Sequence, residues 1–339
     1  MRDYGINVLS QYHIEVTSTR KTRGAILCDT DQGLLLLKEA KVSRKRVPVL
    51  HEICVHLENC GYENVDKILR NKEDQLVSEA EDGTKYLVKR WFDGRECDIR
   101  KEYEVMEGSK NLASLHLMLE KPIDLSGVLR ETPIDLADFR GNNLKDEYVR
   151  HNRELNKVRS FIRSKVSKGE FELEFLKYFN YIYDEAKLIT ASLEESGYEE
   201  LYKASLEGNT VIHGDYNYHN ILMTSQGMAT TNFDHFYVDI QVADLYYFLR
   251  KAMEKHRWNE RLGDGMLNAY SRIRSLSEAE LGYVALRLAY PEKFWKVANT
   301  YYHSNKAWIP VKSVEKLQIA IRQMEEKKEF LKNIFSFQL

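Results

Sequence analysis

The feature that most constrains this chain is a short polar loop between two apolar runs. His213-Gly214-Asp215 follows the apolar pair Val211-Ile212, Asn220 comes five residues after Asp215, and apolar residues resume at Ile221. This pattern predicts one strand that enters the loop and a second strand that leaves it. Because the strands fix both ends of the loop, we expect the side chains of Asp215 and Asn220 to project together into a cleft.

The loop resembles the HGDxxxxN catalytic loop of aminoglycoside phosphotransferases and choline kinases, a relative of the protein-kinase loop. The resemblance implies phosphoryl transfer, with Asp215 as the base beside the attacking hydroxyl and Asn220 as a magnesium ligand. His213 is expected to brace the loop rather than react. The implied fold is α+β and bilobal, protein-kinase-like (aminoglycoside phosphotransferase-like), with a small antiparallel-sheet lobe and a mainly helical lobe.

The next strand departs from this pattern at the position expected to hold a metal ion. Active relatives are expected to carry Asp where this chain carries Asn232, in the run Thr231-Asn232-Phe233-Asp234. A neutral amide oxygen is a weaker ligand for a hard cation than a carboxylate. Asp234 would share a face with Asn232 in a strand, so it is a candidate replacement ligand. The expected magnesium ligands are therefore Asn220, Asn232 and Asp234.

The first third of the chain predicts a small antiparallel sheet with one helix. Alternating or apolar runs separated by turn residues predict strands, and one helical pattern lies between the third and fourth of them. The strands are expected at 12–19, 25–29, 34–38, 75–78 and 86–92, and the helix at 48–59. The break at Asp93-Gly94 predicts a nucleotide-binding lobe over 1–93 and a catalytic and substrate lobe over 94–339.

The second part of the chain is expected to be mostly helical. Apolar residues recur at helical spacing in several long segments, and 123–145 has no clear period. The helices are expected at 100–119, 147–165, 171–195 and 243–256, with more to the C-terminal end. The aromatic stripe in 171–195 is expected to be core. We expect Asp244 to cap its helix and brace the catalytic loop, and His116 to be a packed core residue.

Lys38 closes the third predicted strand, where the resemblance implies a lysine that holds nucleotide phosphates and pairs with a helix glutamate. Glu52 is the best candidate partner on the following helix, and Glu58 is the alternative. Trp91 and Phe92 resemble the family hinge that lines the adenine pocket. The implied cofactors are ATP, or another nucleoside triphosphate, and magnesium.

The turn before the second strand carries three cations, Arg20, Lys21 and Arg23, but a single glycine. Kinase phosphate loops carry three glycines, which let the backbone approach the phosphates. The turn either binds phosphate through its side chains or is a solvated basic turn.

Composition argues against several other classes of protein. The formal net charge is -2, so no field points to nucleic acid or a membrane as a partner. There is no apolar run of about 20 residues, which argues against a membrane-spanning helix, and no signal-peptide pattern, so we expect cytoplasmic synthesis. The 4 cysteines form no CxxC pair and are expected to be reduced thiols rather than zinc ligands.

Over nearly its whole length the chain resembles the CotS family of spore coat proteins. The resemblance is carried by residues 9–12, 23–25, 91–98, 151–155, 158–163, 213–220, 231–234, 243–246, 290–296 and 305–310. It implies a location in the spore coat, other coat proteins as partners and a fold similar to that of the phosphotransferases. It also implies that asparagine at position 232 belongs to this branch.

Two functions of different classes fit these residues, and a third is weaker. The first is a coat-associated protein of kinase-like fold that binds a nucleotide and transfers phosphoryl weakly or not at all, as Asn232 and the glycine-poor turn indicate. The second is an active ATP-dependent phosphotransferase for a small hydroxylated molecule or a coat protein, with Asp215 as base. The third is a structural scaffold with a vestigial pocket.

Overall fold

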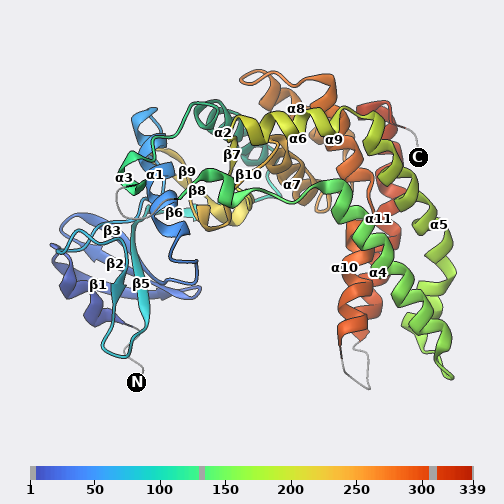
Figure 1. Ribbon diagram of the computed structural model, residues 1–339, viewed down its shortest axis with the longest axis horizontal. Coiled ribbons are helices and arrows are strands. Elements are labelled where there is room, and N and C mark those ends of the chain that lie inside the picture. The colour runs from blue at the N-terminus through green and yellow to red at the C-terminus, as the bar shows by residue number, and fades with distance from the viewer. Residues whose placement is uncertain (1–4, 130–133, 305–310, 338–339) are drawn as a thin grey trace. The chain divides into compact units, whose positions relative to one another are not determined.

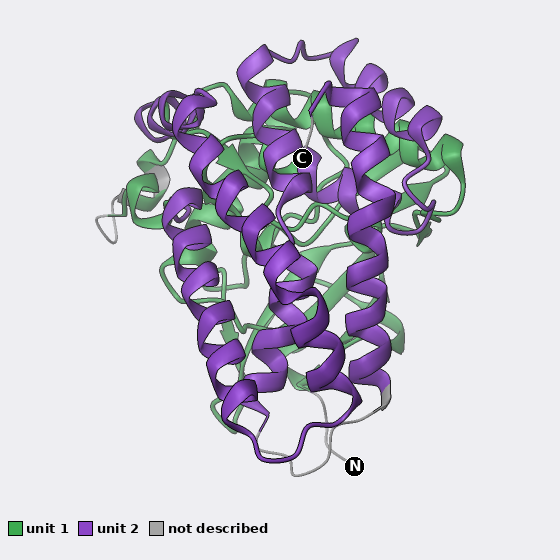
Figure 2. Cartoon of the chain, turned by 90° about the vertical axis from the view of Figure 1, so that its right-hand side faces the viewer, with its two compact units in different colours: residues 1–140, 208–244 green, residues 141–207, 245–339 purple. Residues whose placement is uncertain are grey.

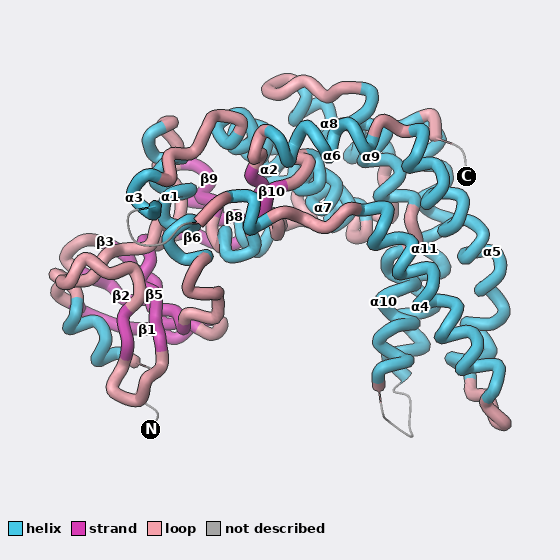
Figure 3. Tube along the Cα trace, viewed as in Figure 1, coloured by secondary structure: helices cyan, strands magenta, loops and turns pink. Residues whose placement is uncertain are grey.

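The computed structural model describes residues 5–129, 134–304 and 311–337 (Figure 1). The chain divides into two compact units, residues 1–140 with 208–244 and residues 141–207 with 245–339 (Figure 2). Within the described residues, every strand belongs to the first unit, and the second unit is helical (Figure 3). The run 305–310, which contributes to the family resemblance, lies outside the described residues.

The first unit opens with a five-stranded antiparallel sheet in the order β1-β2-β3-β5-β4. One helix, α1 (Arg46–Asn59), follows the third strand, so the predicted order of elements is confirmed. The strands are β1 (Val16–Thr22), β2 (Ala25–Thr30), β3 (Gly33–Glu39), β4 (Ser78–Glu79) and β5 (Lys85–Arg90).

Two of the predicted strands begin later than expected, for local reasons. Residues Ile6–Gln11 form a 3-10 helix (η1), and the N–H of Tyr12 donates to the carbonyl of Leu9, so the first strand starts at Val16. The strand expected at 75–78 reduces to β4. There the Asn71 side chain accepts hydrogen bonds from two backbone N–H groups downstream and folds 71–75 into a turn.

Strand alternation decides which side chains reach the site. On β3, Leu35 and Leu37 belong to a buried cluster on one face of the sheet, together with Val88 of β5. Because successive side chains point to opposite faces, Lys38 and Lys89 lie on the other face. Lys38 is paired with Leu87, and Lys89 with Leu36, so the two lysines are diagonal neighbours.

The rest of the first unit surrounds the polar loop. β6 (Gly94–Glu96), β8 (Ile221–Thr224) and β9 (Gly227–Thr230) form a three-stranded sheet, and β7 (Val211–Ile212) pairs with β10 (Tyr237–Val238). The helices here are α2 (Glu102–Leu119) and the short α3 (Ser126–Leu129), with 3-10 turns η2 (Leu136–Phe139), η4 (Tyr218–Asn220) and η5 (Phe233–His235).

β6 begins at Gly94, where the sequence predicts a break rather than a strand. A Cβ on Gly94 would lie 2.5 Å from the Met223 carbonyl, so only glycine permits this close pairing with β8. Residues after 93, up to 140, belong to the same compact unit as the N-terminal sheet. The lobe boundary at 93 is a different division of the chain and stays a prediction.

The second unit is built from long helices around an aromatic core. The helices are α4 (Leu144–Ser164), α5 (Glu170–Ser192), α6 (Tyr198–Glu207), most of α7 (Val242–Met253), α8 (Glu260–Ser271), α9 (Glu278–Ala289), α10 (Glu292–His303) and α11 (Val311–Phe335). A short 3-10 turn, η3 (Leu193–Glu195), follows α5. Side chains cap several helix starts, as where Asn143 accepts two N–H groups at the start of α4.

The aromatic stripe of α5 is core, as predicted. Phe171, Phe175 and Phe179 are buried in one cluster, and the Phe175 ring stacks on Phe294 of α10 with centroids 5.2 Å apart. Of the helices that the structure describes, none combines the length and apolarity needed to cross a bilayer.

Phe175→Ala should lower the free energy of unfolding by about 3–5 kcal/mol, because it leaves a cavity in a close-packed core. Urea denaturation of the purified chain measures this change. Leu173→Ala on the same helix is the matched control, since Leu173 is 58% exposed and a surface substitution should change the free energy by less than about 0.5 kcal/mol. Equal losses in the two variants would contradict this packing.

Candidate functional site

The polar loop at 213–220 is anchored by the carboxylate of Asp244. Its two oxygens accept the backbone N–H of His213 at 2.7 Å and of Gly214 at 3.0 Å. Asp244 is buried and braces the loop as predicted, but it is the third residue of α7 and both of its oxygens face the loop, so it does not cap the helix. His116 is buried beside it, with Nε2 3.5 Å from an Asp244 oxygen, which agrees with a packed core histidine.

His213 holds the loop through its ring. Nδ1 accepts the backbone N–H of Asp215 at 3.1 Å, which leaves Nε2–H to donate to the Thr231 carbonyl at 3.0 Å. The ring thereby ties the loop to the segment after β9. Gly214 has a φ of 79°, and a Cβ there would lie 2.0 Å from the His235 carbonyl oxygen, so only glycine fits.

Asp215 and Asn220 lie together. Asn220 Nδ2 donates to the Asp215 carboxylate at 3.0 Å and to its backbone carbonyl at 2.8 Å. Asn217 Nδ2 donates to the other carboxylate oxygen at 2.9 Å. These two amides hold the Asp215 carboxylate in one orientation. Asp215 is half-buried, so part of the residue stays accessible. The two side chains therefore contact each other, and of the two it is Asn220 that lines the cavity described below.

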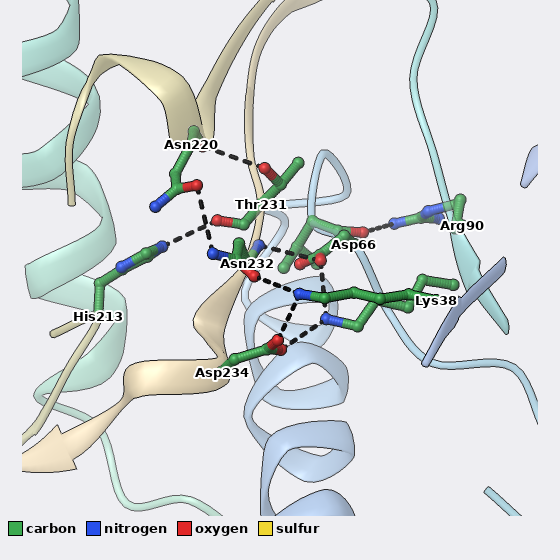
Figure 4. Close-up of polar contacts among 10 residues, drawn as sticks. Lys38, Asp66, Arg90, His213, Asn220, Thr231, Asn232 and Asp234 are labelled. Carbon is green, nitrogen blue, oxygen red and sulfur yellow. Dashed lines mark hydrogen bonds and ion pairs between the residues drawn. The ribbon is translucent and has the colours of Figure 1, made fainter. Parts of the chain in front are cut away.

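Asn232 occupies the centre of the site (Figure 4). Its backbone is left-handed, with φ 68° and ψ 48°, a conformation that asparagine and aspartate tolerate better than most residues. Its Oδ1 accepts a hydrogen bond from Lys38 Nζ at 2.9 Å, and its Nδ2 faces Asn220 Oδ1 at 3.4 Å. Its backbone N–H donates to Asp66 at 2.9 Å.

Two lysines and two aspartates, Lys38, Lys89, Asp66 and Asp234, form what we call the lysine–aspartate quartet. Lys38 Nζ lies 2.7 Å from Asp234 Oδ2, and Lys89 Nζ lies 3.0 Å from Asp234 Oδ1. Lys89 Nζ also lies 2.9 Å from Asp66. The side chains of Lys89 and Asp66 are each only 1% exposed, so this part of the quartet is shielded from water.

The pKa values follow from this burial and pairing. Burial alone raises the pKa of Asp234, but the ammonium groups of Lys89 and Lys38 overcome it and hold the pKa well below its usual range. Burial alone lowers the pKa of Lys89, but the carboxylates of Asp66 and Asp234 raise it above its ordinary value. The charges of Asp234 and Lys89 are therefore present at neutral pH.

A cavity of about 380 Å³ opens beside the quartet. Lys38, Lys89, Asp66, Asn220, Asn232 and Trp91 contribute to its wall. Of the candidate residues of the sequence, Lys38, Asn220, Asn232 and Trp91 therefore line one space, while Asp234 contacts Lys38 from behind this wall. Arg23, Glu96 and His219 also line it, and Glu96 lies 2.5 Å from His219 Nδ1 and 3.8 Å from Arg23. Arg20 and Lys21 lie on β1 rather than in the predicted turn, and Arg20 contacts Asp29 at 3.8 Å.

Glu52 and Phe92 are not brought to the quartet. The acidic partner that the structure gives Lys38 is Asp234, whereas Glu52 lines a separate cavity of about 400 Å³ with Arg44 and Arg70. Burial raises the pKa of Glu52, although Arg70 opposes this. The inward face of α1 is apolar, at residues 50, 53, 54 and 57, and Glu52 lies on its flank. Phe92 packs beneath the Arg90 guanidinium, 5.6 Å away.

Glu58, the alternative partner, also pairs elsewhere. Its carboxylate contacts Lys67 and lies 2.8 Å from Arg90. Sequence reasoning missed Lys89 and Asp66. A lysine within the apolar run 86–92 and an aspartate between Val65 and Ile68 were the available signals, because a charged residue in an otherwise buried segment needs a partner.

Comparison with known proteins assigns the chain to a protein family. The family model described as "Spore coat putative kinase YutH" matches residues 6–334. This chain belongs to that family. It is 22% identical to spore coat protein S of Bacillus subtilis (strain 168), over 96% of this chain and 92% of that protein. The predicted resemblance to CotS-type coat proteins is confirmed.

Solved structures show the fold. An aminoglycoside phosphotransferase from Alicyclobacillus acidocaldarius matches with a TM-score of 0.83 at 16% identity, over 97% of this chain and 95% of that chain. Spectinomycin phosphotransferase APH(9)-Ia, in complex with ADP and spectinomycin, matches with a TM-score of 0.57 at 11% identity, over 95% and 96%. The predicted phosphotransferase-like fold is therefore confirmed.

Asp234→Asn should lower the free energy of unfolding by about 3 kcal/mol at pH 7, the lower end for breaking a buried ion pair, because Lys89 keeps Asp66. The paired carboxylate stabilises the fold above its unfolded pKa, and this contribution is lost as pH falls through the lowered folded pKa. The difference from wild type should therefore shrink below about pH 4.

Urea denaturation between pH 7 and pH 3 measures both effects. Glu81→Gln is the control, because Glu81 is exposed and its removal should cost less than about 0.5 kcal/mol. A loss in Asp234→Asn that does not change with pH would contradict the assigned pairing.

Proposed function

We propose that this member of the spore coat kinase-like family binds a nucleoside triphosphate in the cavity beside Lys38 and transfers its phosphoryl group weakly or not at all. The observation that carries the proposal is Asn232. It lies between Lys38 and Asn220, where the phosphotransferase resemblance implies a metal-binding aspartate. The site keeps the residues for binding and orientation but has an amide where a charge is expected.

Nucleotide binding is supported by the shape and chemistry of the cavity. Its volume of about 380 Å³ falls in the range of small-molecule pockets. Trp91 offers an aromatic surface for a base, and the Lys38 side chain, 28% exposed, offers an ammonium group to phosphate. A structural relative, spectinomycin phosphotransferase, has been solved with ADP.

Weak transfer is supported by the electrostatics. Phosphoryl transfer depends on cations and fixed dipoles that stabilise the charge on the transferred group. Asn232 contributes no carboxylate to hold a metal ion, and both Asp234 oxygens are paired with lysines. The coat context comes from the family, and we extend it to this chain as a location in the spore coat with other coat proteins as partners.

An active ATP-dependent phosphotransferase is the second candidate. It is favoured by Asp215, whose carboxylate is held by Asn217 and Asn220 and is half-buried rather than enclosed. That orientation suits a base that accepts the proton of an attacking hydroxyl. The acceptor would be a small hydroxylated molecule or a coat protein.

ATP should bind the purified chain in calorimetry, and Lys38→Met should weaken it about tenfold or more, because a charge-assisted bond to phosphate is lost. Lys85→Met is the matched control, since Lys85 is an exposed lysine on β5. It should leave the affinity unchanged. No ATP binding by the wild type would sink the proposal and favour a scaffold with a vestigial pocket.

ATP turnover separates the two candidates. We expect turnover far below the rate of about 1–100 per second typical of kinases, with or without hydroxylated acceptors. Turnover at kinase rates in the wild type, lost in Asp215→Asn while ATP still binds, would establish the active phosphotransferase instead. Phosphate release measured by a coupled assay gives the rate.

A further inference from the structure

The oxygen atoms expected to hold a magnesium ion are already occupied by N–H donors. Lys38 donates to Asn232 Oδ1 at 2.9 Å, and Asp234 receives Lys38 on one oxygen and Lys89 on the other. Asn220 Oδ1 faces the Asn232 amide at 3.4 Å. Both carboxylate oxygens of Asp215 accept side-chain amides.

This donor set does not fit magnesium. Mg²⁺ requires near-octahedral oxygen ligands and is normally held by one or two carboxylates together with phosphate oxygens. Here the quartet combines two carboxylates with two ammonium groups, so its net charge is zero before any ion arrives. A divalent cation at Asp234 would lie beside two ammonium groups that repel it.

Lys89 is the buried member of this arrangement and cannot readily leave it. Its side chain is 1% exposed and lies between Asp66 and Asp234, at 2.9 and 3.0 Å. Removing one partner of such a buried pair leaves an uncompensated charge, so Lys89 does not leave its place at low cost. Lys38 is different, because its side chain is 28% exposed and its ammonium group lies at the cavity wall.

We propose that this site binds the phosphates of a nucleoside triphosphate without a divalent cation, with the ammonium group of Lys38 supplying the charge that a metal ion would supply. This inference rests on the proposed nucleotide binding. When Lys38 turns from Asp234 to a phosphate oxygen, Asp234 keeps Lys89 as its partner. Lys89 is therefore a positioning residue, which neutralises Asp234 and releases Lys38 to the ligand.

The direct test is calorimetry of ATP binding to the wild-type chain, once in EDTA and once in excess Mg²⁺. We expect dissociation constants within about threefold of each other, a difference too small to include a metal contact. Binding that is tenfold or more weaker in EDTA would overturn the inference and leave nucleotide binding intact. Binding in neither condition would overturn the proposed function itself.

A charge-restoring variant tests the cause. Asn232→Asp is nearly isosteric, and aspartate accepts the left-handed backbone found at this position. The added carboxylate should weaken ATP binding in EDTA and make it about tenfold or more tighter with Mg²⁺ than without it. If the variant is indifferent to Mg²⁺, the side chain at 232 does not face the phosphates and the inference fails.

Lys89→Met tests the positioning role and should likewise make ATP affinity depend on Mg²⁺, because Asp66 and Asp234 regain a net negative charge. Lys85→Met, an exposed lysine on the same strand, should remain indifferent to Mg²⁺. Circular dichroism checks that each variant is folded. If Lys89→Met is folded and binds ATP equally in EDTA and Mg²⁺, Lys89 has no positioning role.

Discussion

One buried carboxylate, that of Asp234, is shared by two ammonium groups that arrive from neighbouring strands of the sheet. A lysine or a carboxylate buried alone would be costly, and the cost is offset only when each charge finds a partner at hydrogen-bonding distance. The pairing joins β3 and β5 to the turn after β9, segments that are far apart in the sequence. The wall of the cavity is fixed by this contact.

Asp244 fixes the polar loop in the same way as Asp234 fixes the sheet, because one buried carboxylate binds two donors. Its carboxylate holds the N–H groups of His213 and Gly214, and the His213 ring then orients the backbone of Asp215. The position of Asp215 is thus set by residues that do not line the cavity. The contacts that anchor residues 213–215 therefore do not include the side chain of Asn232.

The parts of the fold that could be predicted are those that a local sequence pattern specifies. The strands around Asp215 and Asn220, the hairpin before Lys38 and the aromatic stripe of α5 each follow from spacing over a few residues. Lys89 could not be placed, because its partners Asp66 and Asp234 lie 23 and 145 positions away in the sequence. The prediction that Glu52 pairs with Lys38 relied on the general pattern of the fold, whereas in the structure Lys38 pairs with Asp234. β6 was missed because its pairing depends on a close approach that only glycine allows.

The absence of a side chain at Gly214 has a mechanical consequence. The backbone there lies directly against the His235 carbonyl, and a short distance away the His213 ring is bonded to the Thr231 carbonyl. The loop that carries Asp215 and the segment that carries Asn232 are thereby held together at two points. A larger residue at position 214 would push these two segments apart and so draw Asp215 away from Asn232.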